Sequence, residues 1–457
     1  MDGSGLTVEP LASARPGTAR RMATGAVLLA LVVSAFEGTV VTSAMPTITH
    51  ELGGQHLYSW VFSGFLFAST VGVLISGKLV DWLGRRPVFF GGMGLFLVGS
   101  ALCGLAESVP VLIAFRVLQG LGAGALQPTT LTISADLYTL RERAAVQGLF
   151  TGAWAVGNTL GPVIGGWLVM RASWRWVFLV NVPVGLFAAA LLYLSYRDSP
   201  RRSDVRLDRW GPLLAGTSAA LLLFSLEPGH VEVRWLCALG AVLVGAVLVR
   251  QQRASASPLL PVELLKDRTV LSGVAGGIAA GALLYSMAAW VPLWMTEQGG
   301  HTPMGAGLAL LPMLLGWSVG STFGVKLLVR GGMRLSAGVS FAVAALGAGF
   351  LSLSTALGWG VPAALVGLGV LGLGLGPAAS TSLMGPQFRA PWHHRGIVTS
   401  SLYATRLLGG SLAVALLALA RGHFAAQFAL AAGLTALAAL VLGLFAPGRA
   451  EPAAPSV

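Results

Sequence analysis

Residues 77–87 read GKLVDWLGRRP and lie between two runs of apolar residues. Glycines flank an acidic residue here, and two arginines follow the second glycine. Glycine permits the tight turn and close backbone approach that join two neighbouring helices. An acid among several cations can form ion pairs that break and re-form when two bodies of helices move. The stretch therefore indicates a helix–turn–helix junction that takes part in a conformational change. Its expected switch residues are Gly77, Asp81, Gly84, Arg85 and Arg86.

The composition of the chain is that of a membrane protein. Of its 457 residues, 55% are hydrophobic and 10% are charged, against about 25% charged in an average soluble domain. Its mean hydropathy is +0.78. These values exclude a disordered chain and an ordinary soluble enzyme. Cys103 and Cys237 both fall in apolar runs, so we expect neither a disulfide nor a metal site.

Apolar runs of membrane-spanning length recur along the chain, and about 20 residues suffice for one span. The fourteen runs predict an all-α polytopic membrane protein, although the seventh and eighth are short. They are residues 24–45, 58–77, 88–106, 111–134, 146–169, 176–195, 211–226, 234–249, 270–294, 304–325, 335–356, 361–384, 397–419 and 424–446.

The basic residues alternate in density from loop to loop. Most of the 29 lie in loops on the side of the N-terminus, and the opposite loops hold only Arg171, Arg175, Arg234 and Arg421. This positive-inside distribution predicts a plasma-membrane protein, which we expect to be bacterial, with both termini in the cytoplasm and an even number of helices. The rule does not decide between twelve and fourteen helices, but hydropathy favours fourteen. The net charge of +12 then reflects topology and lipid contact rather than nucleic-acid binding.

Two charged residues lie well inside predicted spans of the N-terminal half. Arg116 is in the fourth run, where an arginine costs about 2.5–3.5 kcal/mol on insertion scales. Glu37, in the first run, is the only acid well inside any span, and such a carboxyl is a candidate functional site. Burial and a neighbouring arginine act in opposite directions on its protonation, which suits a proton carrier. The alternative is a purely structural ion pair with Arg116.

The fifth run contains GNTLGPVIGG at residues 157–166. Its glycines recur every four residues, so they share one smooth helix face, and its proline bends the helix. A plain contact between small residues is the alternative interpretation. The expected switch residues here are Gly157, Gly161, Pro162, Gly165 and Gly166.

These motifs resemble those of the major facilitator superfamily, specifically its fourteen-helix drug:proton antiporters of the EmrB/QacA type. The junction at 77–87, the Arg116 stretch and the Gly-Pro-x-x-Gly-Gly sequence match three signatures, and the resemblance extends over residues 22–446. Further matches are SWRWVFLVNVPVG at 173–185, AGLALLP at 306–312 and TRLLGGS at 405–411. The family usually has aspartate where Glu37 stands. No acid occurs in the last six spans, which argues against export of dications.

The resemblance implies two six-helix halves, plus an inserted helix pair, with the substrate between the halves. The implied segments are the cytoplasmic tails 1–21 and 447–457, the halves 22–200 and 256–446, and the insertion 201–255. Counted without the inserted pair, helices 1, 4, 7 and 10 line the cavity by this resemblance; they are the runs 24–45, 111–134, 270–294 and 361–384. Glu37 and Arg116 are then the proton-coupling residues. The expected substrate-binding residues are Glu37, Gln119, Gln127, Tyr285, Trp290, Ser380 and Thr381, with an interfacial aromatic belt as the alternative for Trp290.

The function implied is proton-coupled multidrug efflux, without a cofactor, metal ion or enzymatic activity. Moving one charge through 100 mV is worth about 2.3 kcal/mol, so exporting a dication for one proton would oppose the membrane potential. We therefore expect neutral or monocationic lipophilic substrates. The expected partners are a drug-like small molecule, protons and membrane lipids, for a monomeric chain that binds no nucleic acid. A dedicated exporter of one natural product or lipid remains the alternative.

Overall fold

The computed structural model describes residues 17–138, 140–198, 208, 210–226, 231–255, 266–298, 300–389 and 395–448. Within these ranges the regular structure is entirely helical, as predicted. The helices are α1 (Gly17–Glu51), η2 (Gln55–Leu57), α2 (Tyr58–Leu83), α3 (Arg85–Gly104), α4 (Val109–Leu137), α5 (Leu140–Arg171), α6 (Trp176–Leu179), α7 (Asn181–Ser195), α8 (Trp210–Ser225), α9 (Val231–Ala254), α10 (Arg268–Glu297), α11 (Pro303–Leu308), α12 (Leu311–Ala356), α13 (Val361–Arg389), α14 (Arg395–Ala418) and α15 (Phe424–Phe445).

The predicted apolar runs correspond to these helices, with three differences in detail. The sixth run is divided into α6 and α7. The run 304–325 is divided between α11 and α12. It is also continuous with the run 335–356 in α12, but Gly332 interrupts α12 with φ 76° and ψ 179°. Only glycine adopts such a backbone conformation readily, so the break lies where the sequence permits it.

Among the described residues, twelve helices are long and apolar enough to cross a membrane. The short helix α8, with 16 residues, and the glycine-rich α5 are not among the twelve. The chain is therefore a multi-pass membrane protein with twelve to fourteen spans.

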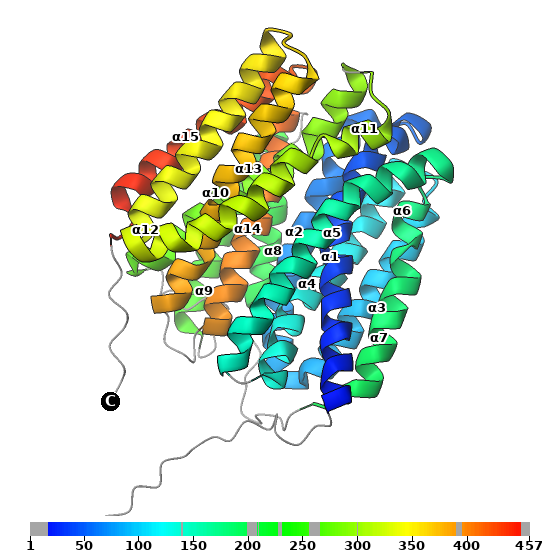
Figure 1. Ribbon diagram of the computed structural model, residues 1–457, viewed down its shortest axis with the longest axis vertical. Coiled ribbons are helices and arrows are strands. Elements are labelled where there is room, and N and C mark those ends of the chain that lie inside the picture. Colours follow the sequence, from blue (N-terminus) through cyan, green and yellow to red (C-terminus); the bar gives the residue numbers. More distant parts are fainter. Residues whose placement is uncertain are drawn as a thin grey trace, which may run out of the picture.

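The helices pack as two groups, α1–α7 and α10–α15, that face one another (Figure 1). The α8–α9 hairpin packs against α2 and α14, one helix from each group. The start of α1 and the finish of α15 lie at the same end of the bundle, which we call the terminal end (Figure 1). The opposite end is the far end. Residues 1–16 and 449–457 of the predicted tails, and residues 199–209 apart from Asp208, lie outside the described residues; residues 17–21 of the predicted N-terminal tail belong to α1.

Glycines on α5 determine how closely it approaches α1. A Cβ atom added at Gly157 would lie 2.6 Å from the carbonyl oxygen of Val32, and one at Gly161 would overlap the Thr39 hydroxyl. A Cβ atom at Gly165 would lie 2.5 Å from the carbonyl oxygen of Val40. The predicted smooth face therefore exists, and it lies against the helix that carries Glu37.

Candidate functional site

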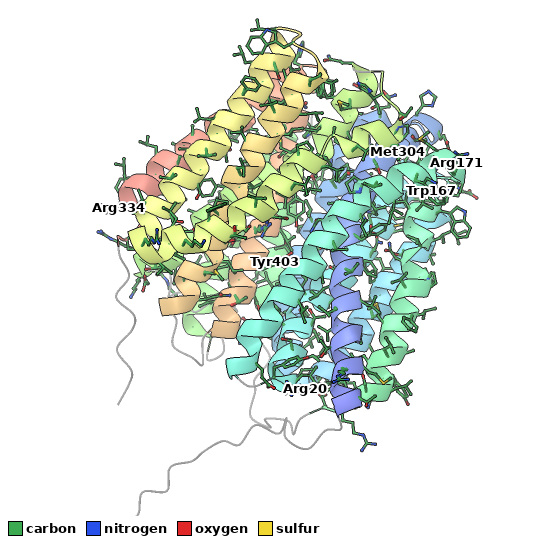
Figure 2. All side chains as sticks on the ribbon, viewed as in Figure 1. Arg20, Trp167, Arg171, Met304, Arg334 and Tyr403 are labelled. Atoms are coloured by element: carbon green, nitrogen blue, oxygen red, sulfur yellow. The ribbon has the colours of Figure 1, made fainter. Side chains whose placement is uncertain are left out.

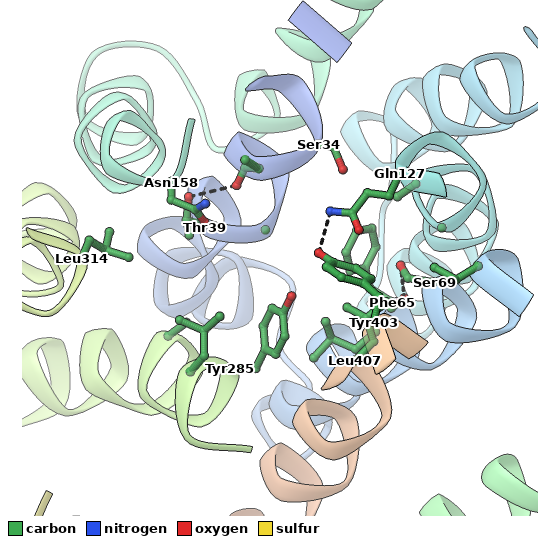
Figure 3. Close-up of a pocket in the computed structure, with 18 of the residues that line it drawn as sticks. Ser34, Thr39, Phe65, Ser69, Gln127, Asn158, Tyr285, Leu314, Tyr403 and Leu407 are labelled. Carbon is green, nitrogen blue, oxygen red and sulfur yellow. Dashed lines mark hydrogen bonds between the residues drawn. The ribbon is translucent and has the colours of Figure 1, made fainter. Parts of the chain in front are cut away.

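A cavity lies between the two groups of helices, in the middle of the bundle. It encloses about 690 Å³ of empty space, part of it open to solvent. Helices α1, α2, α4 and α5 line it on one side, and α10, α12 and α14 line it on the other (Figure 3).

The polar lining of the cavity consists of amides and hydroxyls. Gln127 of α4 donates a hydrogen bond of 2.5 Å to the Tyr403 hydroxyl of α14, which joins the two groups of helices (Figure 3). Tyr285 of α10 points into the same space (Figure 3). Apolar and aromatic side chains supply most of the remaining surface. The other polar lining residues are Ser34, Thr39, Ser69 and Asn158.

Glu37 lies outside this cavity, on the other face of α1. Its side chain is fully buried, and its carboxylate accepts hydrogen bonds from Arg116 and, at 2.5 Å, from the Asn181 amide. Consecutive residues of a helix point about 100° apart. Glu37 therefore points towards α4 and α7, whereas Gly38 and Thr39 of the same turn face the cavity.

Arg116 connects this buried carboxylate to a larger polar network. Its Nη1 also donates to the side-chain oxygen of Gln119 at 2.7 Å, and Gln119 donates to the Ser100 hydroxyl at 2.6 Å. The Arg116 guanidinium carbon lies 3.9 Å from the centre of the Phe65 ring. A buried charge is tolerated where it is paired and hydrogen-bonded, and both members of this pair are.

The two groups of helices contact one another between the cavity and the far end. The Tyr58 hydroxyl donates to the Ala289 carbonyl at 2.7 Å, and Ser63 and Ser411 exchange hydrogen bonds of 3.0 and 2.8 Å through their hydroxyls and carbonyls. Met304 of α11 lies beside the far end of α5 (Figure 2). A Cβ atom added at Gly166 would overlap the backbone of Met304. These contacts close the bundle between the cavity and the far end.

The junction at 77–87 forms an ionic cluster at the terminal end. Gly84 has φ 96°, and the backbone N–H groups of Arg85 and Arg86 donate to the Asp198 carboxylate at 3.1 and 3.2 Å. The Arg85 side chain lies 3.3 Å from the carboxylate of Asp136 in α4. Gly77 faces the other group of helices, since a Cβ atom there would lie 3.9 Å from the Ser400 hydroxyl. The side chain of Asp81 lies outside what the structure describes.

A sequence model of the Major Facilitator Superfamily matches residues 27–414. The chain belongs to the Major Facilitator Superfamily. Its fold is accordingly a major facilitator fold. Among solved structures, the POT family transporter PepTSo is similar with a TM-score of 0.68 and 17% sequence identity. That likeness covers 92% of this chain and 97% of PepTSo.

Curated relatives in the superfamily carry transporter names. The multidrug transporter protein MdtP of Bacillus subtilis is 32% identical over 314 residues, which are 67% of this chain and 58% of MdtP. Multidrug resistance protein 3 of the same organism is 32% identical over 303 residues, 65% of this chain and 59% of that protein. The efflux pump dotC of Dothistroma septosporum is 29% identical over 306 residues, 64% of this chain and 53% of dotC. The matches thus span less than two thirds of these relatives.

The structure does not bring all of the predicted cavity residues together. Gln127 and Tyr285 line the cavity, as expected from their helices. Glu37, Arg116 and Gln119 do not line it. They form the buried network behind α1, because their side chains satisfy one another there. Their roles in proton coupling and in substrate binding remain predictions.

The predictions for the tenth helix and for Trp290 differ from the structure. The tenth helix, α13, packs along α12 and contributes no residue to the cavity. Ser380 bonds to its own helix at Gly376, and Thr381 pairs with Ser336 of α12 at 2.6 Å. Trp290 is buried and lies 5.6 Å from the Tyr58 ring between centroids, so it is neither in the central cavity nor in an interfacial belt.

Sequence reasoning did not single out several residues that the structure brings to the site. Asn181 lies in the quoted stretch 173–185, and Asn158 lies in the quoted stretch 157–166. Both motifs thus contained a signal: an amide among apolar residues inside a span. Tyr403 is two residues before the stretch 405–411, and Asp136 and Asp198 follow apolar runs without any local motif.

Proposed function

We propose that this protein is a proton-coupled antiporter that exports lipophilic, neutral or monocationic small molecules across the cytoplasmic membrane. Within the superfamily we place it among the fourteen-helix drug:proton antiporters. The observation that carries the proposal is the buried Glu37–Arg116–Asn181 cluster directly behind the wall of the central cavity. An intramembrane carboxyl held in this way is a functional site by default, because burying it without a use is costly.

A single helix connects the two parts of this proposed mechanism. Helix α1 presents Ser34 and Thr39 to the cavity and Glu37 to the buried cluster. A proton that reaches Glu37 removes the negative charge that holds Arg116 and Asn181. The resulting rearrangement acts on α1, and thereby on the cavity wall and on the α5 glycine face that contacts Thr39. Proton and substrate are thus coupled through the position of α1.

The arrangement of the halves supports alternating access. The far end is closed by the contacts of Tyr58, Ser63 and Ser411 across the halves. With both termini in the cytoplasm, this conformation has its cavity closed towards the outside. Opening that end and closing the terminal end would move a bound molecule outwards.

Dedicated export of one natural product remains a second candidate. It is favoured by one relative, the Acurin A biosynthesis cluster MFS-type transporter of Aspergillus aculeatus, which is 29% identical over 301 residues, 63% of this chain and 54% of that protein. Its name associates it with one biosynthetic cluster rather than with many drugs. A narrow substrate range in transport assays would favour this candidate over multidrug export.

Transport by the purified protein in proteoliposomes tests the proposal. An imposed proton gradient should drive accumulation of members of a panel of neutral and monocationic dyes, and a protonophore should abolish it. Glu37→Gln should lose this accumulation, whereas Glu232→Gln, an exposed carboxyl at the start of α9, should retain it. Gradient-independent accumulation, or full activity of Glu37→Gln, would contradict the proposal.

A further inference from the structure

Building on the proposed function, we propose that the central cavity selects uncharged aromatic molecules that carry hydrogen-bonding groups, and that it rejects monocations of the same shape. This inference narrows the substrate class beyond the lipophilic neutral or monocationic molecules of the antiporter. It rests on the chemistry of the cavity wall and on the location of the charged side chains near it.

The wall of the cavity contains no charged side chain among the residues that the structure describes. Its polar groups are two amides, three aliphatic hydroxyls and two phenols, from both halves of the molecule (Figure 3). A cation that leaves water for such a site loses its hydration and gains no counter-charge. A neutral molecule loses far less, because amides and hydroxyls can replace its hydrogen bonds with water.

The carboxylate of Glu37, on the helix that lines the cavity, is already occupied. Both oxygens of Glu37 are engaged, one by Arg116 and the other by the Asn181 amide. Its side chain is fully buried on the opposite face of α1 from the cavity. A cationic substrate would therefore have to displace Arg116 and cross the helix to reach it.

The aromatic wall is also a poor site for a cation. Phe65 lines the cavity, but the guanidinium of Arg116 already lies 3.9 Å from its ring centre. A ring that holds one cation on one face attracts a second cation on the other face weakly, because the two charges repel. In the opposite half, Arg406 of α14 lies 4.7 Å from the centre of the Trp317 ring. Each half thus holds an arginine against an aromatic ring.

The same wall is well suited to a neutral flat molecule with a carbonyl and an N–H or O–H group. Gln127 and Tyr403 face one another across the cavity and at present bond to each other at 2.5 Å. A substrate that inserts between them can accept from one and donate to the other, so no polar group is left unsatisfied. Aromatic and apolar neighbours such as Tyr285 and Leu407 supply contact for the ring faces.

A matched pair of fluorescent tricyclic probes tests this selectivity. Acridone is neutral and carries a carbonyl and an N–H group, whereas 10-methylacridinium is a monocation with the same ring system. Binding is measured on the full-length protein in nanodiscs, without a proton gradient. We expect acridone to bind at least tenfold more tightly than 10-methylacridinium.

An added carboxylate should change this preference. Gln127→Glu places a negative charge in the wall with little change in size, and it should improve binding of 10-methylacridinium at least tenfold. Asn158→Asp should act in the same direction. Gln298→Glu, at the exposed C-terminal end of α10, adds the same charge away from the cavity and should leave the preference unchanged.

Equal binding of the two probes to the unmodified protein, or no binding of acridone, would overturn the inference. If Gln127→Glu and Gln298→Glu changed the affinity for 10-methylacridinium equally, the inference would also be overturned, since the added charge would then act from a distance. Because binding is measured without a gradient, these outcomes are distinguishable from failure of the antiporter proposal, which would appear as the absence of proton-driven accumulation.

Discussion

One methyl group at Gly166 should shift the protein away from the conformation in which its far end is closed. Gly166 lies in α5 where this helix meets α11, and a Cβ atom there would overlap the backbone of Met304. Backbone atoms cannot move aside as a flexible side chain can. The two halves must therefore separate locally if Gly166→Ala is to be accommodated.

The magnitude follows from the cost of overpacking. Forcing an extra methyl into a close-packed contact costs about 1–3 kcal/mol. Because α5 and α11 belong to different halves, the added methyl destabilises the conformation that is closed at the far end. It does not destabilise a conformation in which the halves are apart at that end. A difference of that size corresponds to a shift of roughly 5–150-fold in the equilibrium between the two states.

Cysteine labelling in whole cells measures this shift. Cys103 and Cys237 are replaced by alanine, and Ser34→Cys places a single thiol in the cavity wall. A membrane-impermeant maleimide added outside should react with this thiol roughly 5–150-fold faster when Gly166→Ala is also present than when it is not.

The control corrects for the higher helix propensity of alanine. Gly94→Ala in α3 adds the same methyl at a position with no neighbouring atom within 4 Å, and it should leave the labelling rate unchanged. An unchanged rate in Gly166→Ala, with the protein folded, would refute the reasoning, because closure at this end would then not depend on the contact between α5 and α11.

Two further predictions concern stability. Asp198→Ala removes the carboxylate that accepts hydrogen bonds from the backbone N–H groups of Arg85 and Arg86, and it should lower the free energy of unfolding by about 0.5–2 kcal/mol. An unchanged thermal midpoint in detergent would show that water replaces this cap. Thr381→Val alone should lower the free energy of unfolding by about 0.5–1.5 kcal/mol, because the buried Ser336 hydroxyl loses its bond at 2.6 Å and keeps only a long bond of 3.4 Å to the Gly324 carbonyl. The double variant with Ser336→Ala should recover most of the loss. Additive losses in the same melting assay would contradict that pairing.

The sequence predicts the helices well because span length and hydropathy are local properties. It also predicts the smooth face of α5, since glycines four residues apart share a side of any helix. The interruption of α12 at Gly332 fits two separate apolar runs, 304–325 and 335–356, joined by a short segment that carries Lys326, Arg330 and Arg334. What the sequence does not contain is how each helix is rotated relative to its neighbours.

The candidate site shows the effect of that missing information. Glu37 and Thr39 are two residues apart, yet one faces a buried network and the other the cavity. Which of them faces the substrate depends on contacts with Arg116 and Asn181, from segments that are distant in the sequence. Similarly, Trp290 is buried beside Tyr58 of the opposite half, and no local pattern indicates that partner.

The central claim is that Glu37 couples protons to transport without forming the substrate site. Proteoliposomes distinguish two activities: accumulation driven by a proton gradient, and exchange of labelled for unlabelled substrate at equal pH. Glu37→Gln is predicted to lose gradient-driven accumulation while it retains equal-pH exchange, because the cavity wall is unchanged. Gradient-driven accumulation by Glu37→Gln at the rate of the unmodified protein would contradict the account.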